Sequence, residues 1–221
     1  LSARREGKLE SVAEECEEVQ TTVLPLDVTD RGANEDAVET IREEHGGLDL
    51  TFFNAGVYGD MPEPINPDTF EKDFDVNFFG LVYGMNAALP LLRESDIGRI
   101  VAMSSATAYG PLPRASSYGA SKAAVKYAVE ALRFEWQAKD VDVGLSVVCP
   151  GFVDTPMTEQ NDFPMPFMVD VEDAAEIIVR GVYRGKQEIS FPLRLILPLK
   201  LISTLPSFLY NRLISLVTGL A

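Results

Sequence analysis

The chain has 221 residues, 46% of them hydrophobic and 24% charged, which are the proportions of one large globular domain and exclude disorder or collagen-like repetition. Acidic residues outnumber basic ones by 34 to 19, and the net charge of −15 argues against nucleic-acid binding because a polyphosphate backbone would be repelled. The single histidine, His45, and the two cysteines, Cys16 and Cys149, lie in contexts that favour neither a Ser-His-Asp hydrolase nor a metal site.

Apolar segments of strand length alternate along the chain with longer segments of helical period. A helix is predicted around residues 9–19, a strand over 21–26, a helix from 33 to the glycine pair 46–47, and a wholly apolar strand over 48–53, which we expect to be buried on both faces. A long helical region over 68–94, a strand over 99–104, a helix over 117–139, a strand over 143–149, a helix over 171–184 and a strand over 188–191 follow. The alternation predicts an α/β fold with a doubly wound parallel sheet between two helix layers, in a single domain over residues 1–191.

In such a sheet, ligands bind beyond the C-terminal ends of the strands. Each predicted strand is followed by polar or backbone-exposing groups, which suit a cofactor crevice. These groups are Ala3-Arg4-Arg5, Asp27-Val28, Asn54-Ala55-Gly56, Ser104-Ser105 and Pro150-Gly151.

Tyr118 and Lys122 lie four residues apart at the start of a predicted helix, and therefore on one helical face. A phenol with a pKa of about 10 is a poor base at neutral pH, and lowering that pKa by roughly three units requires about 4 kcal/mol of extra stabilisation of the phenolate. A partly buried lysine, assisted by a positively charged oxidised cofactor ring, is a source of that stabilisation. Tyr118 would then exchange a proton with a substrate oxygen. Taken alone, the pair is common and more typical of a surface tyrosine and a solvated lysine.

Two further polar side chains support a catalytic interpretation. Ser105 closes the strand over 99–104, and its hydroxyl can donate a hydrogen bond to a carbonyl oxygen on which charge develops, whereas Ser104 faces the opposite way. Asn77 is an amide within an apolar helical stretch and needs a partner. It either holds a water that relays protons to Lys122, or bends the helix while its amide bonds to its own backbone.

Five of these motifs, in this order and spacing, resemble the short-chain dehydrogenase/reductase family from Leu1 to about Phe191: Asn54-Ala55-Gly56, Asn77, Ser105, Tyr118-x-x-x-Lys122 and Pro150-Gly151-x-x-x-Thr155. The resemblance implies an oxidoreductase that interconverts a ketone and a secondary alcohol. It implies that Tyr118 is the general acid/base, that Lys122 lowers the pKa of Tyr118 and holds the nicotinamide ribose, that Ser105 orients the carbonyl, and that Asn77 maintains a proton relay.

The resemblance also implies cofactor contacts and an oligomer. The implied contacts are Asn54, Ala55 and Gly56 at the ribose, Asp27 and Val28 at the adenine, Val153 and Thr155 at the nicotinamide carboxamide, and the Pro150-Gly151 turn. A homodimer or homotetramer is expected through the helices over 68–94 and 117–139. No metal is implied.

Two departures from the family pattern affect this interpretation. Phe53 stands where the family usually has a second Asn, and the Gly-rich phosphate loop is absent, because the sequence starts at what looks like the end of the second strand. Without that loop we expect the chain as written to bind cofactor poorly, so that the natural protein is longer or this copy is a remnant. The remnant interpretation leads to an alternative function, a non-catalytic dinucleotide-sensing or scaffold protein on the same fold; a dehydratase or epimerase is a weaker alternative.

The end of the second strand of the family pattern, where this chain begins, also predicts the cofactor. NAD-selective sites usually place an acidic residue there, whereas this chain has Arg4 and Arg5, whose guanidinium groups suit a 2′-phosphate. NADP(H) is therefore expected over NAD(H), unless the two arginines simply begin a solvated helix.

The proline-broken segment over residues 156–168 contains three Met and two Phe and predicts an apolar wall for a hydrophobic small-molecule substrate, or alternatively a lid that touches no substrate. Residues 186–221 hold four basic residues and one acidic residue, a net charge of +3, so that the rest of the chain carries −18. The leucine-rich part, 192–221, is predicted to be a C-terminal extension that lies on an anionic membrane or packs against the sheet edge or a second subunit. No signal peptide is recognised, and a reducing cytoplasm is the simplest setting.

Overall fold

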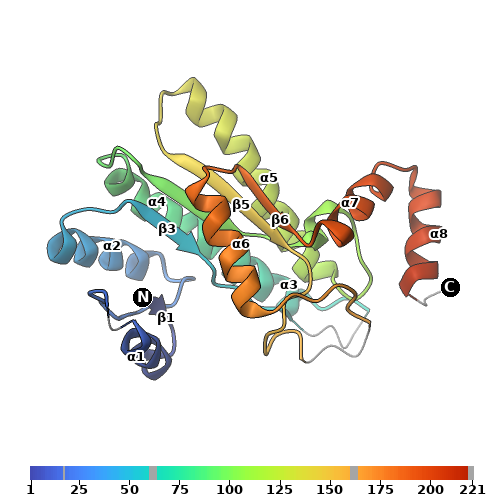
Figure 1. Cartoon of the computed structure of the whole chain (residues 1–221), viewed down its shortest axis with the longest axis horizontal. Coiled ribbons are helices and arrows are strands. Elements are labelled where there is room, and N and C mark those ends of the chain that lie inside the picture. Colours follow the sequence, from blue (N-terminus) through green and yellow to red (C-terminus); the bar gives the residue numbers. More distant parts are fainter. Residues whose placement is uncertain (17, 60–63, 160–163, 219–221) are drawn as a thin grey trace.

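The structure is a computed structural model that describes residues 1–16, 18–59, 64–159 and 164–218 (Figure 1). Its strands pair in parallel within an α/β architecture. The main sheet has the order β3-β4-β5-β6, formed by β3 (Leu50–Phe53), β4 (Arg99–Met103), β5 (Gly144–Pro150) and β6 (Glu188–Phe191). A separate two-stranded sheet pairs β1 (Ser2–Ala3) with β2 (Leu24–Pro25). All of these pairings are parallel, and the predicted doubly wound α/β fold is confirmed.

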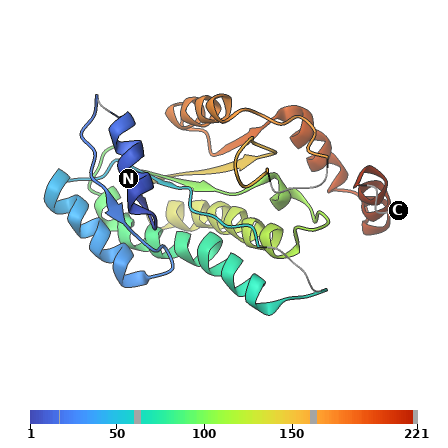
Figure 2. The same cartoon turned by 90° about the horizontal axis from the view of Figure 1, so that it is seen from below.

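Helices cover both faces of the main sheet (Figure 2). On one face lie α4 (Gly80–Leu92) and α5 (Ser116–Ala138), with α2 (Arg31–His45) packed beside α4; α6 (Val171–Tyr183) covers the other face. α1 (Glu6–Glu15) packs against the small sheet, and α3 (Pro67–Phe74) runs through a π-helical turn, η1 (Asp75–Phe79), directly into α4. The long helical region predicted over residues 68–94 is therefore these three segments in series.

Local sequence signals account for where several helices begin and end. The Asp30 side chain accepts a hydrogen bond of 3.0 Å from Ala33 N at the start of α2, and the helix ends at Gly46, whose φ of 75° is favourable only for a residue without Cβ. The Asn66 side chain caps α3 in the same way, with Pro67 at the first helical position.

Two apolar clusters join the helix layers to the sheet. The smaller lies under α6 and contains Val101, Val148, Ala174, Ile189 and Phe191. The larger lies between the sheet and the layer of α4 and α5, and consists of Leu81, Met85, Ala88, Leu92, Ile100, Ala102, Val125, Val129, Trp136, Val143, Leu145, Val147 and Cys149. Because each fully buried aliphatic side chain contributes about 1.5–3 kcal/mol, this cluster is the main source of stability for the packing of α5 against the sheet.

The expected burial of the strand over 48–53 on both faces is wrong. Phe53 packs against the larger cluster, but Leu50 and Phe52 are each 42% exposed, because alternate side chains point to the opposite face, where they line an open groove. The strand predicted over 21–26 is also shorter than expected, since only Leu24 and Pro25 pair with β1.

After β6 the chain continues into α7 (Leu193–Ile202) and α8 (Ser207–Thr218), at the end of the molecule remote from α1 and α2 (Figure 1). The inner side of α7 packs Ile196 and Leu199 against Ala106. Within the part of the chain that the structure describes, no helix is both long and apolar enough to cross a bilayer.

Candidate active site

The two serines that follow β4 contact different partners. Ser104 Oγ donates to the Lys122 carbonyl oxygen at 2.7 Å, which fixes α5 against the strand. Ser105 Oγ accepts from Thr107 N at 3.2 Å, and the Ser105 side chain is close enough to Tyr118 to oppose the rise in its pKa. The two hydroxyls that could act on one substrate oxygen, those of Ser105 and Tyr118, are thus neighbours.

Tyr118 lies in the first turn of α5 and is half-buried. Burial raises the pKa of its phenol to about 12; the Ser105 side chain opposes this rise, and the nearby carboxyl of Asp73 adds to it. The ring of Tyr58 meets the Tyr118 ring edge to face, with centroids 5.3 Å apart, and limits how the phenol can turn. At neutral pH the Tyr118 side chain is therefore a protonated acid held in a fixed direction.

Lys122 is buried one turn further along the same helix. Its Nζ donates to the Met103 carbonyl oxygen at 2.9 Å and lies 5.8 Å from the centroid of the Tyr118 ring. Burial lowers the pKa of Lys122 to about 8, while the negative charge of Asp73 opposes that change. At neutral pH the ammonium is charged and close to the phenol.

Gly56, Asn77 and Lys122 converge at the end of β3. A Cβ added to Gly56 would lie 3.3 Å from both Asn77 Oδ1 and Lys122 Nζ, so only glycine fits there without displacing one of them. Asn77 sits in the π-helical turn, which re-aims its side chain: Oδ1 accepts from Val57 N at 2.8 Å, and Nδ2 donates to Val57 O and to Ser121 Oγ, both at 2.9 Å. The amide is satisfied by a distant loop and by α5, not by its own helix.

Most of the residues singled out in the sequence lie along one groove beyond the strand ends. Asp27 lies outside that group; its carboxylate accepts from the backbone and the hydroxyl of Thr29, which hold its pKa below the usual value, and Arg4 is close enough to act on it as well. Val28, Ala55 and Asn77 line a small adjoining cavity. The groove itself is lined by Arg5, Asn54, Gly56, Tyr118, Lys122, Pro150, Gly151, Val153 and Thr155.

The segment over 156–168 is only partly described, because residues 160–163 lie outside the described ranges. Met157 lines the groove, and Val153 forms an isolated parallel bridge with Val169 that holds the two ends of the segment together. Thr155 N donates to Thr158 Oγ1 at 3.0 Å, which shapes the turn after Val153.

Asp73 is a residue of this site that sequence reasoning missed. Its carboxyl is fully buried between α3 and α5; Ser117 Oγ donates to Oδ2 at 2.6 Å and Gly59 N donates to Oδ1 at 3.1 Å. Burial raises the pKa of Asp73 in spite of these bonds. A signal was present, because Asp73 and Asn77 are polar residues four apart on an otherwise apolar helix face.

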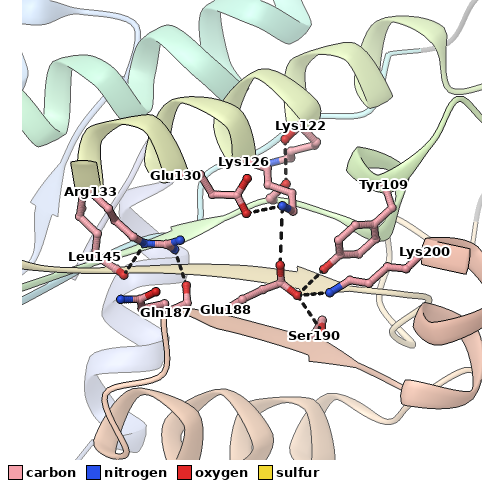
Figure 3. Close-up of polar contacts among 11 residues, drawn as sticks. Tyr109, Lys122, Lys126, Glu130, Arg133, Leu145, Gln187, Glu188, Ser190 and Lys200 are labelled. Atoms are coloured by element: carbon pink, nitrogen blue, oxygen red, sulfur yellow. Dashed lines mark hydrogen bonds and ion pairs between the residues drawn. The ribbon is translucent and has the colours of Figure 1, made fainter. Parts of the chain in front are cut away.

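A partly buried carboxylate, Glu188 on β6, joins three elements around the site (Figure 3). Its carboxylate accepts from Tyr109 Oη at 2.9 Å and from Lys200 Nζ on α7 at 2.5 Å, and lies 3.6 Å from Lys126 Nζ on α5. Tyr109 ends the short helix η2 (Ala106–Tyr109) that follows Ser105 directly. Burial alone would raise the pKa of Glu188, but these donors and the two ammonium groups hold it below the usual value.

Glu188→Gln is therefore expected to destabilise the fold by about 1–2 kcal/mol at pH 7, since two lysines lose their shared carboxylate. Because the pKa of Glu188 is lowered in the folded state, its contribution is present above the ordinary glutamate pKa and is lost as the pH falls through the lowered one. Urea unfolding at pH 7 and at acid pH measures both effects. Glu176→Gln, at an exposed i,i+4 pair on α6, is the matched control and should change stability by less than about 0.5 kcal/mol. Equal stability of Glu188→Gln and wild type at pH 7 would contradict this account.

In comparisons with known proteins, the chain matches one family model and relatives named as an oxidoreductase and a dehydrogenase. The "short chain dehydrogenase" family model matches residues 1–164. An uncharacterized oxidoreductase of Myxococcus xanthus is 34% identical over 213 residues, covering 95% of this chain and 83% of its own length. The 11-beta-hydroxysteroid dehydrogenase A of Sesamum indicum is 33% identical over 213 residues, and the match spans 87% of this chain and 60% of that protein.

Two solved structures share the fold. An alcohol dehydrogenase from Thermococcus sibiricus, complexed with 5-hydroxy-NADP, has a TM-score of 0.76 at 23% identity and covers 86% of this chain and 83% of its own. A short chain dehydrogenase/reductase from Burkholderia phymatum, in complex with NAD, has a TM-score of 0.80 at 21% identity and covers 91% of this chain and 82% of its own. At these identities the two structures establish the architecture.

Proposed function

The chain belongs to the short-chain dehydrogenase/reductase family of NAD(P)-binding oxidoreductases, and from that premise we propose that it interconverts a ketone and a secondary alcohol with Tyr118 as general acid/base. The observation that carries the proposal is the Tyr118 phenol at the groove with the Lys122 ammonium 5.8 Å from its ring centroid and Ser105 close enough to affect its pKa. Turnover of ketones with NADPH that disappears in Tyr118→Phe is the result that tests it.

The residues of the groove fit a nicotinamide cofactor. Gly56 lines the groove and lies against Asn77 Oδ1 and Lys122 Nζ, which supports contacts from Asn54, Ala55 and Gly56 beside the Lys122 ammonium. Lys122 would hold the nicotinamide ribose, Val153, Thr155 and the Pro150-Gly151 turn would line the carboxamide end, and Asp27 and Val28 would lie at the adenine end. The bound cofactor would supply or accept the hydride.

In the reduction direction, Tyr118 donates its proton to the substrate oxygen while Ser105 donates a hydrogen bond to the same oxygen. A pKa of about 12 keeps the phenol protonated and ready for this step. In the oxidation direction the phenolate must form, and the Lys122 ammonium is the nearby positive charge that favours it. Lys122 and Asn77 together form the start of the proposed proton relay toward solvent.

NADP(H) is the proposed cofactor. Arg4 and Arg5 are exposed at the end of β1, and Arg5 also lines the groove. NAD-selective sites usually place an acidic residue at this strand end, where this chain has the two arginines. Arg5 also stands at the N-cap of α1, and the helix N-terminus favours an anion as well.

Replacing Arg4 with Asp is expected to lower kcat/KM with NADPH about 10- to 100-fold and to leave the value with NADH higher or unchanged, because a charge-assisted bond to the 2′-phosphate is replaced by repulsion. Steady-state kinetics with both cofactors measure the ratio. Arg31→Asp, at an exposed arginine on α2, is the matched control. An unchanged preference for NADPH in Arg4→Asp would remove this assignment.

The proposed substrate is a small molecule with a hydrophobic body. Met157 lines the groove, and Phe167 and Met168 are exposed in the same segment over residues 156–168. These three side chains support an adaptable apolar wall. The relative from Sesamum indicum is named as a hydroxysteroid dehydrogenase, which supports an alcohol or ketone of this class.

We also propose that residues 1–191 are the cofactor-binding and catalytic domain, that 192–221 are an extension, and that the protein is a cytoplasmic homo-oligomer. Exposed Phe79 and Val82 at the start of α4 and exposed Phe134 on α5 support association through these helices.

A further inference from the structure

Two consecutive helices at the C-terminal end carry a continuous series of exposed apolar side chains. On α7, Leu193, Leu197 and Leu201 are spaced four apart and all exposed, so they form one stripe. On α8 the exposed apolar side chains and Arg212 fall within one half of the helix circumference, and the exposed polar residues Ser207, Asn211 and Thr218 lie outside it. We call these two faces the tail surface; its α8 part is Phe208, Leu209, Arg212, Leu213, Leu216 and Val217.

The opposite sides of both helices are fixed to the body. Lys200 of α7 bonds to Glu188 of β6, and Ile196 is fully buried. On α8, Tyr210 Oη donates to Pro111 O at 2.8 Å, and a Cβ at Gly110 would lie 2.6 Å from that hydroxyl oxygen, so the helix approaches the loop as closely as glycine allows. The tail surface is therefore held outward by the fold and does not result from a loosely attached helix.

The charge on the tail surface differs from that of the rest of the protein. No acidic residue follows Glu188 in the sequence, whereas residues 1–185 carry a net charge of −18. Lys200 is turned inward to Glu188, and the exposed cations are Arg194, next to the α7 stripe, and Arg212, between Phe208 and Leu216. An apolar face with arginines in it and no carboxylate requires anions from its partner.

This requirement distinguishes the possible partners. If the tail surface met the same surface on a second copy, Arg194 and Arg212 would face each other with no carboxylate between them. An anionic lipid layer offers both an apolar region for the leucines and phosphate or carboxylate groups at the depth of the arginines. We propose that α7 and α8 dock on an anionic lipid surface as interfacial helices, with Leu193, Leu197, Leu201, Phe208 and Leu216 immersed and the arginines at the headgroups.

The inner sides of α7 and α8, opposite the tail surface, are attached close to the proposed site. Pro111, which holds Tyr210, belongs to the loop between Ser105 and Tyr118, and α7 packs Leu195 against Gly151 in the proposed cofactor turn. Docking would bring the groove close to lipid, where a hydrophobic ketone dissolves; this consequence, unlike docking itself, rests on the proposed function.

Vesicle flotation without cofactor or substrate tests the docking separately from any activity. The whole chain is expected to float with phosphatidylcholine vesicles that contain phosphatidylserine, and less with phosphatidylcholine alone. The double variant Leu201→Glu/Leu216→Glu is expected to reduce the bound fraction about tenfold, because two immersed leucines become charged. Ile97→Glu is the matched control, since Ile97 is 72% exposed and Leu201 70% exposed, on different surfaces; it should float like wild type.

Circular dichroism and thermal melting confirm that each variant is folded. The proposal is overturned if the folded wild-type chain stays unbound at every lipid composition, or if the double variant floats as well as wild type. It is also overturned if wild type does not bind vesicles and sedimentation shows that wild type is a dimer while the double variant is a monomer. A second copy would then cover the tail surface. Turnover is not read in this experiment, so a failure of the proposed reaction leaves its outcome unchanged.

Discussion

Tyr118→Phe is expected to lower kcat for ketone reduction about 10²- to 10⁴-fold, the range that general acid/base catalysis contributes. The change removes only the phenolic oxygen, the group proposed to donate the proton to the substrate oxygen. The packing of the ring against Tyr58 stays, so the fold and the affinity for NADPH should stay as well. Initial rates and a cofactor titration on the same preparation separate the two effects.

The matched control for this variant is Tyr127→Phe, which removes a hydroxyl from an exposed tyrosine on the same helix. It should leave kcat within about twofold of wild type, as is usual for surface substitutions. If Tyr118→Phe kept most of its activity, another group would be the acid, and the assignment of Tyr118 would be wrong.

Lys122→Met is expected to change both the rate and its pH dependence. A unit charge 5.8 Å from the phenol ring contributes about 3 kcal/mol at an effective dielectric constant of about 20, so its removal should cost about 100-fold in kcat for alcohol oxidation. Methionine keeps the apolar stem and approximate volume of the lysine, although the Met103 carbonyl loses its donor. The phenolate of Tyr118 would then form only at higher pH.

The pH profile decides whether Lys122 acts on Tyr118 or only supports the fold. In wild type, the oxidation rate should rise with pH as Tyr118 loses its proton, and support from Lys122 should weaken above about pH 8, where Lys122 itself becomes neutral. In Lys122→Met the weakening near pH 8 should be absent, because no ammonium remains to titrate there. A variant with reduced rate but an unchanged profile would show a structural role alone, and thermal melting measures how large that role is.

Elements with strong apolar periodicity could be predicted from sequence nearly to their ends. The helix predicted over 171–184 is Val171–Tyr183, and the strand predicted over 188–191 is Glu188–Phe191. The strand over 21–26 was overestimated because strand length depends on the partner, and β1 pairs with only two of its residues. The exposure of Phe52 could not be predicted either, since burial is decided by what packs on that face.

The residues of the site also divide into those that the sequence predicts and those that only the structure reveals. Tyr118 and Lys122 are placed by helical spacing alone, which sequence reveals. The roles of Asp73 and Glu188 depend on contacts with Ser117 and Tyr109, which are 44 and 79 residues away in the sequence, and no local pattern encodes them. The raised pKa of Tyr118 likewise follows from burial by distant segments, so the tuning of this phenol was accessible only from the structure.

Transfer of deuterium tests the central claim most directly. NADPH deuterated on its nicotinamide ring would be incubated with the chain and a panel of hydrophobic ketones that includes a steroid ketone, and the products analysed by mass spectrometry. The account predicts an alcohol that carries the deuterium on the former carbonyl carbon with wild type, and at most a trace of it with Tyr118→Phe. Wild-type protein that binds NADPH but transfers no deuterium to any ketone, or equal transfer by the two proteins, would contradict it.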